Sequence, residues 1–107
     1  MKGYYFITDS GLSRAGNTSD VMRAVSCGVE VVQYRNKSAE TRKMYEEALR
    51  LREICQDAIF LINDRIDIAM ATDADGVHLG QSDMPCRTAL ELLGPEKIIG
   101  MTDPQSF

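Results

Sequence analysis

Charged side chains stand directly after several apolar runs of this sequence. Two of them, Asp64 and Asp83, are carboxylates of the kind that hold Mg²⁺ together with waters and the phosphate oxygens of a substrate. Arg35 and Lys37 alternate along an extended segment, so both can project to one side, one as a bidentate fork and one as a point charge. This combination of charges predicts a site for a phosphate ester with a divalent cation.

Two amide side chains, Gln33 and Asn63, follow the same apolar runs and hydrogen-bond readily to an uncharged heterocycle or amine. Together with the charges they favour Mg²⁺-assisted handling of a diphosphate ester, in which metal and cations stabilise the departing pyrophosphate. The sequence carries no Gly-rich phosphate loop, no Ser/His/Asp triad signature and no zinc-ligand spacing. We therefore assign no nucleophile or general base.

Each of these residues also has a purely structural interpretation. Asp64 and Asp83 precede predicted helices, where a carboxylate is a common cap. His78 lies in a predicted buried strand, where a hydrogen-bonded structural imidazole is an ordinary occupant. Arg35 and Lys37 could belong to a solvated loop. Both interpretations stay open on the residues alone.

The polar residues are positioned by an alternation of strands and helices. Apolar and β-branched runs predict strands over 4–8, 29–34, 58–63, 76–79 and 97–101, with helices starting near residue 17 and over 39–55, 66–71 and 85–93. This rhythm is typical of right-handed βαβ units on a parallel sheet, an α/β fold of the form (βα)4β. In such folds ligands bind beyond the carboxyl ends of the strands, which is where the polar residues lie.

Patterns within these elements predict which side chains are buried. The helix over 39–55 has one apolar stripe, formed by Met44, Ala48, Leu51 and Cys55. Residues 17–20 supply capping side chains for a helix that ends at Gly28 and has one apolar side, with Val21, Met22 and Val25. The continuous apolar run at 58–63 is the kind expected for a strand buried on both faces.

Composition and charge bound the class of protein. The chain has 107 residues, 44% of them hydrophobic and 26% charged, as in a soluble single domain. Its net charge of −4, without a basic stripe, argues against a nucleic-acid partner, and no apolar run approaches the roughly 20 residues of a membrane span. Three cysteines, Cys27, Cys55 and Cys86, form no CxxC pair, which predicts buried thiols in a reducing compartment, and so a cytoplasmic protein.

The chain length also limits the architecture. A closed eight-stranded (β/α) barrel typically needs about 250 residues, so this chain is expected to form only part of such a barrel. An open parallel sheet would present unpaired backbone groups at both edges. We therefore expect the sheet to be completed or covered by oligomerisation, as a homodimer or a higher oligomer.

Five segments carry a resemblance to a known family. The segments at 4–9, 31–37, 61–69, 74–85 and 98–102, among them Gln-Tyr-Arg-Asn-Lys, Asn-Asp-Arg and His-Leu-Gly-Gln-Ser-Asp, strongly resemble the N-terminal half of thiamine-phosphate synthase, in the order of that family. Their number and order make the match more specific than any single motif. They span essentially the whole chain as a single domain, 1–107.

The resemblance implies a partial (β/α) barrel and a role in thiamine biosynthesis. The family's transferase condenses hydroxymethylpyrimidine diphosphate with thiazole phosphate, giving thiamine phosphate and pyrophosphate. By this resemblance the metal ligands for Mg²⁺ are Asp64 and Asp83, and the binding residues for the pyrimidine diphosphate are Gln33, Tyr34, Arg35, Asn36, Lys37, Asn63 and Thr102. Thr102 stands where the family commonly has a serine.

Three functional hypotheses follow. The chain has the transferase activity of the family; or it is a non-catalytic half barrel that binds the Mg²⁺-pyrimidine diphosphate; or it is an inactive truncated homologue. The second and third arise because the family's thiazole-phosphate site lies in the second half of its barrel, which this sequence does not contain.

Overall fold

Five parallel strands and four helices alternate along the chain. The computed structural model describes residues 5–8, 16–36, 39–80 and 84–101. The strands are β1 (Tyr5–Ile7), β2 (Val31–Tyr34), β3 (Ile59–Asn63), β4 (Gly76–Leu79) and β5 (Ile98–Met101), and they lie side by side in this order. The helices are α1 (Asn17–Ser26), α2 (Thr41–Ile54), α3 (Ile66–Thr72) and α4 (Cys86–Leu93). The predicted (βα)4β order is therefore confirmed.

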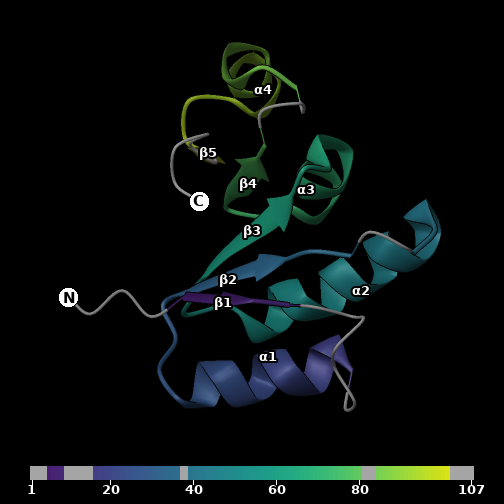
Figure 1. Ribbon diagram of the computed structural model, residues 1–107, viewed down its shortest axis with the longest axis vertical. Helices are drawn as coiled ribbons and strands as arrows, with labels where there is room; N and C mark the ends of the chain where they lie inside the picture. Colours follow the sequence, from purple (N-terminus) through teal and green to yellow (C-terminus); the bar gives the residue numbers. More distant parts are fainter. Residues whose placement is uncertain (1–4, 9–15, 37–38, 81–83, 102–107) are drawn as a thin grey trace.

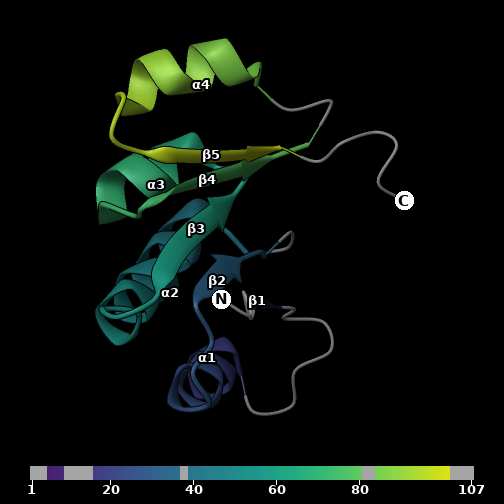
Figure 2. The same ribbon diagram turned by 90° about the vertical axis from the view of Figure 1, so that its left-hand side faces the viewer.

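The helices all lie on one side of a curved sheet. In Figure 1 they form an arc outside the strands, from α1 at the bottom through α2 and α3 to α4 at the top, and Figure 2 shows the same arrangement from the side. Val32, Phe60 and Val77 point into the helix layer and are fully buried. This side of the sheet forms the core, as in a sector of a (β/α) barrel.

The opposite side of the sheet is here called the inner face. The strand register places on it every second residue of each strand, because side chains alternate across a strand. Its members are Tyr5, Ile7, Val31, Gln33, Ile59, Leu61, Asn63, Gly76, His78, Ile98 and Gly100. Among the described residues no helix covers this face (Figure 2).

Helix α2 matches its prediction, whereas α1 differs from it. All four residues of the predicted α2 stripe are buried. Helix α1 already begins at Asn17, after Gly16 with a φ of 92°, so the predicted caps at 17–20 lie in its first turn. Met22 is 56% exposed, whereas Val21 is fully buried and Val25 packs against the core. The reason is the helical period, since residues four apart share a face and adjacent ones do not.

One prediction of burial holds in part and one is wrong for two residues. β3 is buried on both faces in its middle, where Leu61 on the inner face is 5% exposed, but Ile59 on the same face is 39% exposed. All three cysteines are free thiols, but Cys27 and Cys86 are exposed, and only Cys55 is buried. Burial raises the pKa of the Cys55 thiol to about 11, with a smaller opposing effect of Arg52. Cys27 directly follows α1 and Cys86 is the first residue of α4.

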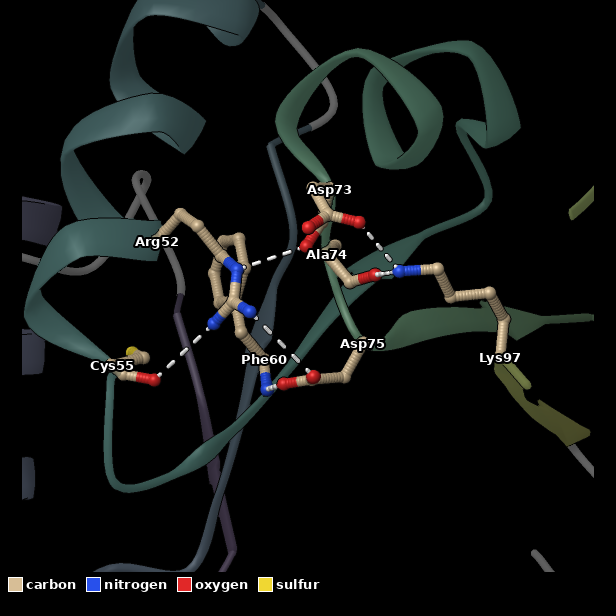
Figure 3. Close-up of polar contacts among 7 residues, drawn as sticks. All are labelled: Arg52, Cys55, Phe60, Asp73, Ala74, Asp75 and Lys97. Atoms are coloured by element: carbon tan, nitrogen blue, oxygen red, sulfur yellow. Dashed lines mark hydrogen bonds and ion pairs between the residues drawn. The ribbon is translucent and has the colours of Figure 1, made fainter.

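The amino ends of β3, β4 and β5 are tied together by the charged cluster drawn in Figure 3. Asp75 accepts a hydrogen bond of 2.8 Å from the backbone N–H of Phe60 and faces Arg52 at 3.7 Å. Arg52 donates to the backbone oxygen of Asp73 at 2.9 Å, and Lys97 pairs with the Asp73 carboxylate at 2.7 Å. This cluster joins α2 and three strands at the end of the sheet opposite the predicted site.

None of the helices in the described part of the chain is long and apolar enough to span a membrane.

Candidate functional site

A hollow of about 580 Å³ lies over the inner face toward the carboxyl ends of the strands. Three residues predicted to bind substrate border it, namely Gln33, Arg35 and Asn63. The remaining lining comes from Tyr5, Ile7, Leu61, His78, Gly100 and Met101. The strand order thus brings together polar side chains as far apart in the sequence as Tyr5 and His78, on apolar walls suited to a flat ring.

A row of hydrogen bonds crosses this face from β1 to β3. The Gln33 side chain donates through Nε2 to the hydroxyl oxygen of Tyr5 at 2.6 Å and accepts at Oε1 from Nδ2 of Asn63 at 2.8 Å. Gln33 is only 3% exposed. Both amides are therefore held in one orientation, which suits recognition of a heterocycle that has donor and acceptor atoms on its edge.

Arg35 is anchored through its backbone rather than its side chain. The Thr8 hydroxyl, which is fully buried, accepts from the Arg35 N–H at 2.9 Å and donates to the Arg35 carbonyl oxygen at 3.2 Å. The Thr8 N–H also donates to the Gln33 carbonyl oxygen at 3.0 Å. These bonds extend the β1–β2 pairing past the strand ends. They hold the Arg35 backbone in place, and so fix the position from which its side chain extends.

Asp64, a predicted metal ligand, directly follows β3 and has a φ of 70°. This left-handed conformation is one that Asp and Asn adopt more readily than most residues. Its N–H donates to the His78 carbonyl oxygen at 2.9 Å, which ties it to β4. Asp64 borders a separate hollow at the start of α3, with Arg65 and Asp67, rather than the hollow over the inner face.

Arg65 is engaged with the first turn of α3. Its Nε and Nη2 atoms donate to the two carboxylate oxygens of Asp67 at 3.0 and 2.7 Å. This hydrogen-bonded pairing lowers the pKa of Asp67 below its ordinary value. The Asp67 carboxylate is therefore paired with Arg65.

The donor chemistry at Asp64 fits a hard cation, because Mg²⁺ prefers carboxylate oxygen and usually takes only one or two protein ligands. The described ranges contain no group of three His, Cys, Asp or Glu side chains that could hold a metal by themselves. The second predicted ligand, Asp83, and the predicted substrate residues Lys37 and Thr102 lie outside the described residues.

Tyr34 and Asn36 lie on the helix side of the sheet. The Tyr34 ring is 1% exposed and its hydroxyl donates to Glu47 of α2 at 2.5 Å. Burial, followed by the hydrogen bond to Glu47, raises the pKa of Tyr34 far above its ordinary value. Asn36 donates to the same carboxylate at 3.4 Å and accepts from the Ala39 N–H at 3.1 Å. Their side chains support the loop into α2 and do not border the hollow.

Sequence reasoning missed Tyr5 as a residue of the hollow and left the role of His78 open. Tyr5 lies on β1 beside Gln33, and His78 lies opposite Asn63 in the β3–β4 register. His78 is half-buried on the inner face, and a Cβ at Gly100 would lie 2.8 Å from its Nδ1 atom, so the glycine makes room for the ring. The period of two along β1 and β4 is the signal that would have found both residues.

Comparison with known proteins identifies the family of this chain. The family model described as thiamine monophosphate synthase matches residues 4–105. The chain belongs to this family. It is 57% identical over 100 residues to the thiamine-phosphate synthase of Methanosarcina barkeri, a match covering 92% of this chain and 46% of the relative. It is also 50% identical over 103 residues to the thiamine biosynthetic bifunctional enzyme of Arabidopsis thaliana, covering 92% and 20%.

A solved structure of the same family superposes closely. The thiamine phosphate pyrophosphorylase from Pyrococcus furiosus matches with a TM-score of 0.85 at 43% identity, covering 92% of this chain and 48% of that one. The chain thus spans about half the length of its thiamine-phosphate synthase relative from Methanosarcina and of this structural neighbour. The resemblance expected from the five sequence segments is confirmed, and with it membership in a family of thiamine biosynthesis.

Proposed function

We propose that this chain binds hydroxymethylpyrimidine diphosphate on its inner face and contributes this substrate site to thiamine-phosphate synthesis. The observation that carries the proposal is the hydrogen-bonded amide pair Gln33–Asn63, fixed at 2.8 Å in a hollow at the carboxyl ends of the strands. Membership in the thiamine monophosphate synthase family supports the identity of the ligand.

The pyrimidine would lie on the apolar wall of the hollow, against Leu61 and Ile7. Gln33 and Asn63 would hydrogen-bond its ring nitrogen and amino group, and their mutual bond would keep both amides in register. Arg35, whose backbone is held by hydrogen bonds to the Thr8 hydroxyl, would bind the diphosphate together with Lys37. Tyr34 and Asn36 would contribute to substrate binding indirectly, because they stabilise the backbone that leads from β2 into α2.

Mg²⁺ is the cation that the family and the carboxylates suggest. Asp64 and Asp83 would hold it, since one or two carboxylates plus the substrate's phosphate oxygens complete a typical Mg²⁺ site. When bound, the ion neutralises charge on the departing pyrophosphate. The strand pairing at His78 fixes the backbone from which Asp64 projects.

The reaction of the family is a substitution at the pyrimidine methylene carbon. The bond from this carbon to the pyrophosphate oxygen breaks, and pyrophosphate leaves with the electron pair. The aminopyrimidine delocalises the resulting positive charge, and the thiazole nitrogen then forms the new C–N bond. No protein nucleophile is required, and the residues of this chain bind and orient the donor.

Calorimetric titration of the purified chain with hydroxymethylpyrimidine diphosphate tests the proposal. We expect binding in the presence of Mg²⁺ and at least about 10-fold weaker binding with a chelator. Asp64→Asn, which tolerates the left-handed backbone, should weaken binding in Mg²⁺ to a similar degree. The matched control is Asp67→Asn, three residues on, which should leave the affinity unchanged. Equal affinity with and without chelator would overturn the metal assignment.

Incubation with both substrates separates the three functional hypotheses. Thiamine phosphate formed by the chain alone would establish the full transferase. Binding without product would favour a half barrel that binds the pyrimidine diphosphate only, and the absence of both would favour an inactive homologue. Because the thiazole-phosphate site of the family is not carried by these residues, we propose binding without product for the isolated chain.

The cytoplasmic location and the homodimer or higher oligomer expected from the sequence stay predictions. The exposed inner face supports association with another polypeptide. Sedimentation of the chain alone measures its oligomeric state.

A further inference from the structure

The chain at the carboxyl end of β2 is held from two sides. The Thr8 hydroxyl binds it from the end of β1, and the Glu47 carboxylate binds it from α2. Neither Thr8 nor Glu47 borders the hollow over the inner face, so neither side chain contacts a ligand that lies there. Any effect of these two residues on binding must therefore pass through the segment between them, residues 34–36.

The Thr8 hydroxyl bonds to both backbone groups of Arg35. It accepts from the Arg35 N–H at 2.9 Å and donates to the Arg35 carbonyl oxygen at 3.2 Å. These bonds use the one hydrogen of the hydroxyl and one of its acceptor positions. Thr8 is fully buried, where a polar group that loses its partner is costly, so the two bonds hold the Arg35 backbone firmly.

The Glu47 carboxylate holds the residues on either side of Arg35. Its Oε1 atom accepts from the Tyr34 hydroxyl at 2.5 Å and from Nδ2 of Asn36 at 3.4 Å. Hydrogen bonds to a carboxylate are stronger than those between neutral groups. Arg35 therefore lies between two residues tied to α2, while its own backbone is tied to β1.

The Arg35 side chain itself is exposed and borders the hollow. No hydrogen bond or ion pair among the described residues holds its guanidinium, so its position depends on the backbone from which it extends. A long side chain loses conformational freedom when it binds an anion, and a backbone that is already fixed lowers the total cost of binding. The planar guanidinium is suited to bidentate binding of a phosphate group.

We infer that Thr8 and Glu47 are positioning residues for diphosphate binding, which hold residues 34–36 so that the Arg35 guanidinium meets the phosphate groups of the ligand. The inference rests on the proposed function, because it requires the diphosphate ester to occupy the hollow. It extends that function to two residues outside the hollow, and both act without touching the ligand.

Titration of the ¹⁵N-labelled chain with two ligands tests the role of Thr8. They are hydroxymethylpyrimidine diphosphate in Mg²⁺ and hydroxymethylpyrimidine, which has the same ring and no phosphate. Thr8→Val keeps the side-chain shape and removes the hydroxyl; it should weaken the diphosphate ester about 10-fold and the alcohol less than about twofold. Thr8→Ser keeps the hydroxyl and should restore most of the affinity.

Thr72→Val is the matched control for Thr8→Val. Thr72 in α3 is also buried, and its hydroxyl donates to the Ile68 carbonyl oxygen at 2.8 Å. The same substitution there removes a buried hydroxyl of the fold and should change neither affinity. Circular dichroism establishes that each variant is folded.

Glu47→Ala tests the same segment from the opposite side, independently of whether Thr8→Val folds. We expect it to weaken the diphosphate ester about 5-fold or more and the alcohol less than about twofold. The matched control is Glu46→Ala, at an exposed position of α2, which should change neither affinity.

A double-mutant cycle tests the route through Arg35. In a chain that carries Arg35→Ala, the further change Thr8→Val should weaken the diphosphate ester less than about twofold, because the group that Thr8 positions is gone. Amide exchange at the Arg35 N–H, measured without ligand, should speed up about 10-fold in Thr8→Val and stay unchanged in Thr72→Val.

The outcomes separate this inference from the proposed function. If the wild-type chain binds the diphosphate ester and both Thr8→Val and Glu47→Ala bind it equally well, the inference alone is refuted. Equal weakening of the ester and the alcohol, or an effect of Thr8→Val that persists in full with Arg35→Ala, also overturns it. A wild-type chain that binds no diphosphate ester refutes the proposed function, and the binding role of the two residues with it.

Discussion

Asp75 is the residue whose replacement tests most clearly how the sheet is held together. Its Oδ2 atom accepts from the backbone N–H of Phe60, a residue that is fully buried, and its Oδ1 atom faces Arg52 at 3.7 Å (Figure 3). Asp75→Ala leaves the Phe60 amide without its acceptor, which costs about 1–3 kcal/mol. The half-exposed ion pair adds at most about 1 kcal/mol, because solvent screens it.

Asp75→Asn separates these two contributions. The asparagine side chain keeps a carbonyl oxygen for the Phe60 amide and loses only the charge, so it should cost less than about 1 kcal/mol. With a urea m-value of about 1.5 kcal/mol/M, a loss of 2 kcal/mol lowers the unfolding midpoint by about 1.3 M. We therefore expect the midpoint of the alanine variant to lie well below that of the asparagine variant. Equal midpoints for the two variants would refute the reasoning, since the charge alone would then account for the loss.

Three further predictions concern acid stability, thiol reactivity and strand packing. Because pairing with Arg65 lowers the pKa of Asp67, the ionised carboxylate contributes fully to the free energy of unfolding above the ordinary pKa of 3.8, and this contribution is lost as the pH falls below that value. Asp67→Asn should therefore make the free energy of unfolding depend less steeply on pH in this acid range. Cys55, with a pKa near 11, should resist alkylation at pH 8 until urea unfolds the chain, whereas Cys27 should react at once, which mass spectrometry resolves. Gly76→Ala should cost about 3 kcal/mol or more in urea unfolding, because the new Cβ would lie 1.9 Å from a backbone oxygen of β5; a loss below about 1 kcal/mol would show that β5 moves aside freely.

The elements that the sequence predicts best are those with long, regular periods. The α2 stripe from Met44 to Cys55 repeats at helical spacing over about three turns, and all of it is buried. The polar residues 17–20 were predicted to cap α1, but they form its first turn, because Gly16 with its positive φ precedes the helix. Cys27 and Cys86 were predicted to be buried from their residue type alone, although both lie on exposed positions.

The candidate site was predicted in part because strand ends mark it in the sequence. Gln33 and Asn63 were found as polar residues at the ends of apolar runs, and they lie together as expected. Alternation along β2 puts Tyr34 on the opposite side of the sheet from Gln33. Tyr34 therefore belongs to the family motif but does not border the hollow. Tyr5 and His78 lie on the inner face by the alternation of β1 and β4, and the pairing of these strands with β2 and β3 sets them beside Gln33 and Asn63.

Side-chain amide resonances give the most direct test of the central claim, that the inner face is the pyrimidine diphosphate site. The chain, labelled with ¹⁵N, is titrated with hydroxymethylpyrimidine diphosphate in Mg²⁺, and separately with pyrophosphate. The account predicts that the Gln33 and Asn63 side-chain amides shift with the pyrimidine ligand and much less with pyrophosphate, while the backbone amides of Phe60 and Asp75 at the opposite end of the strands stay in place. Shifts at the amino-end cluster with none at Gln33 and Asn63 would contradict it.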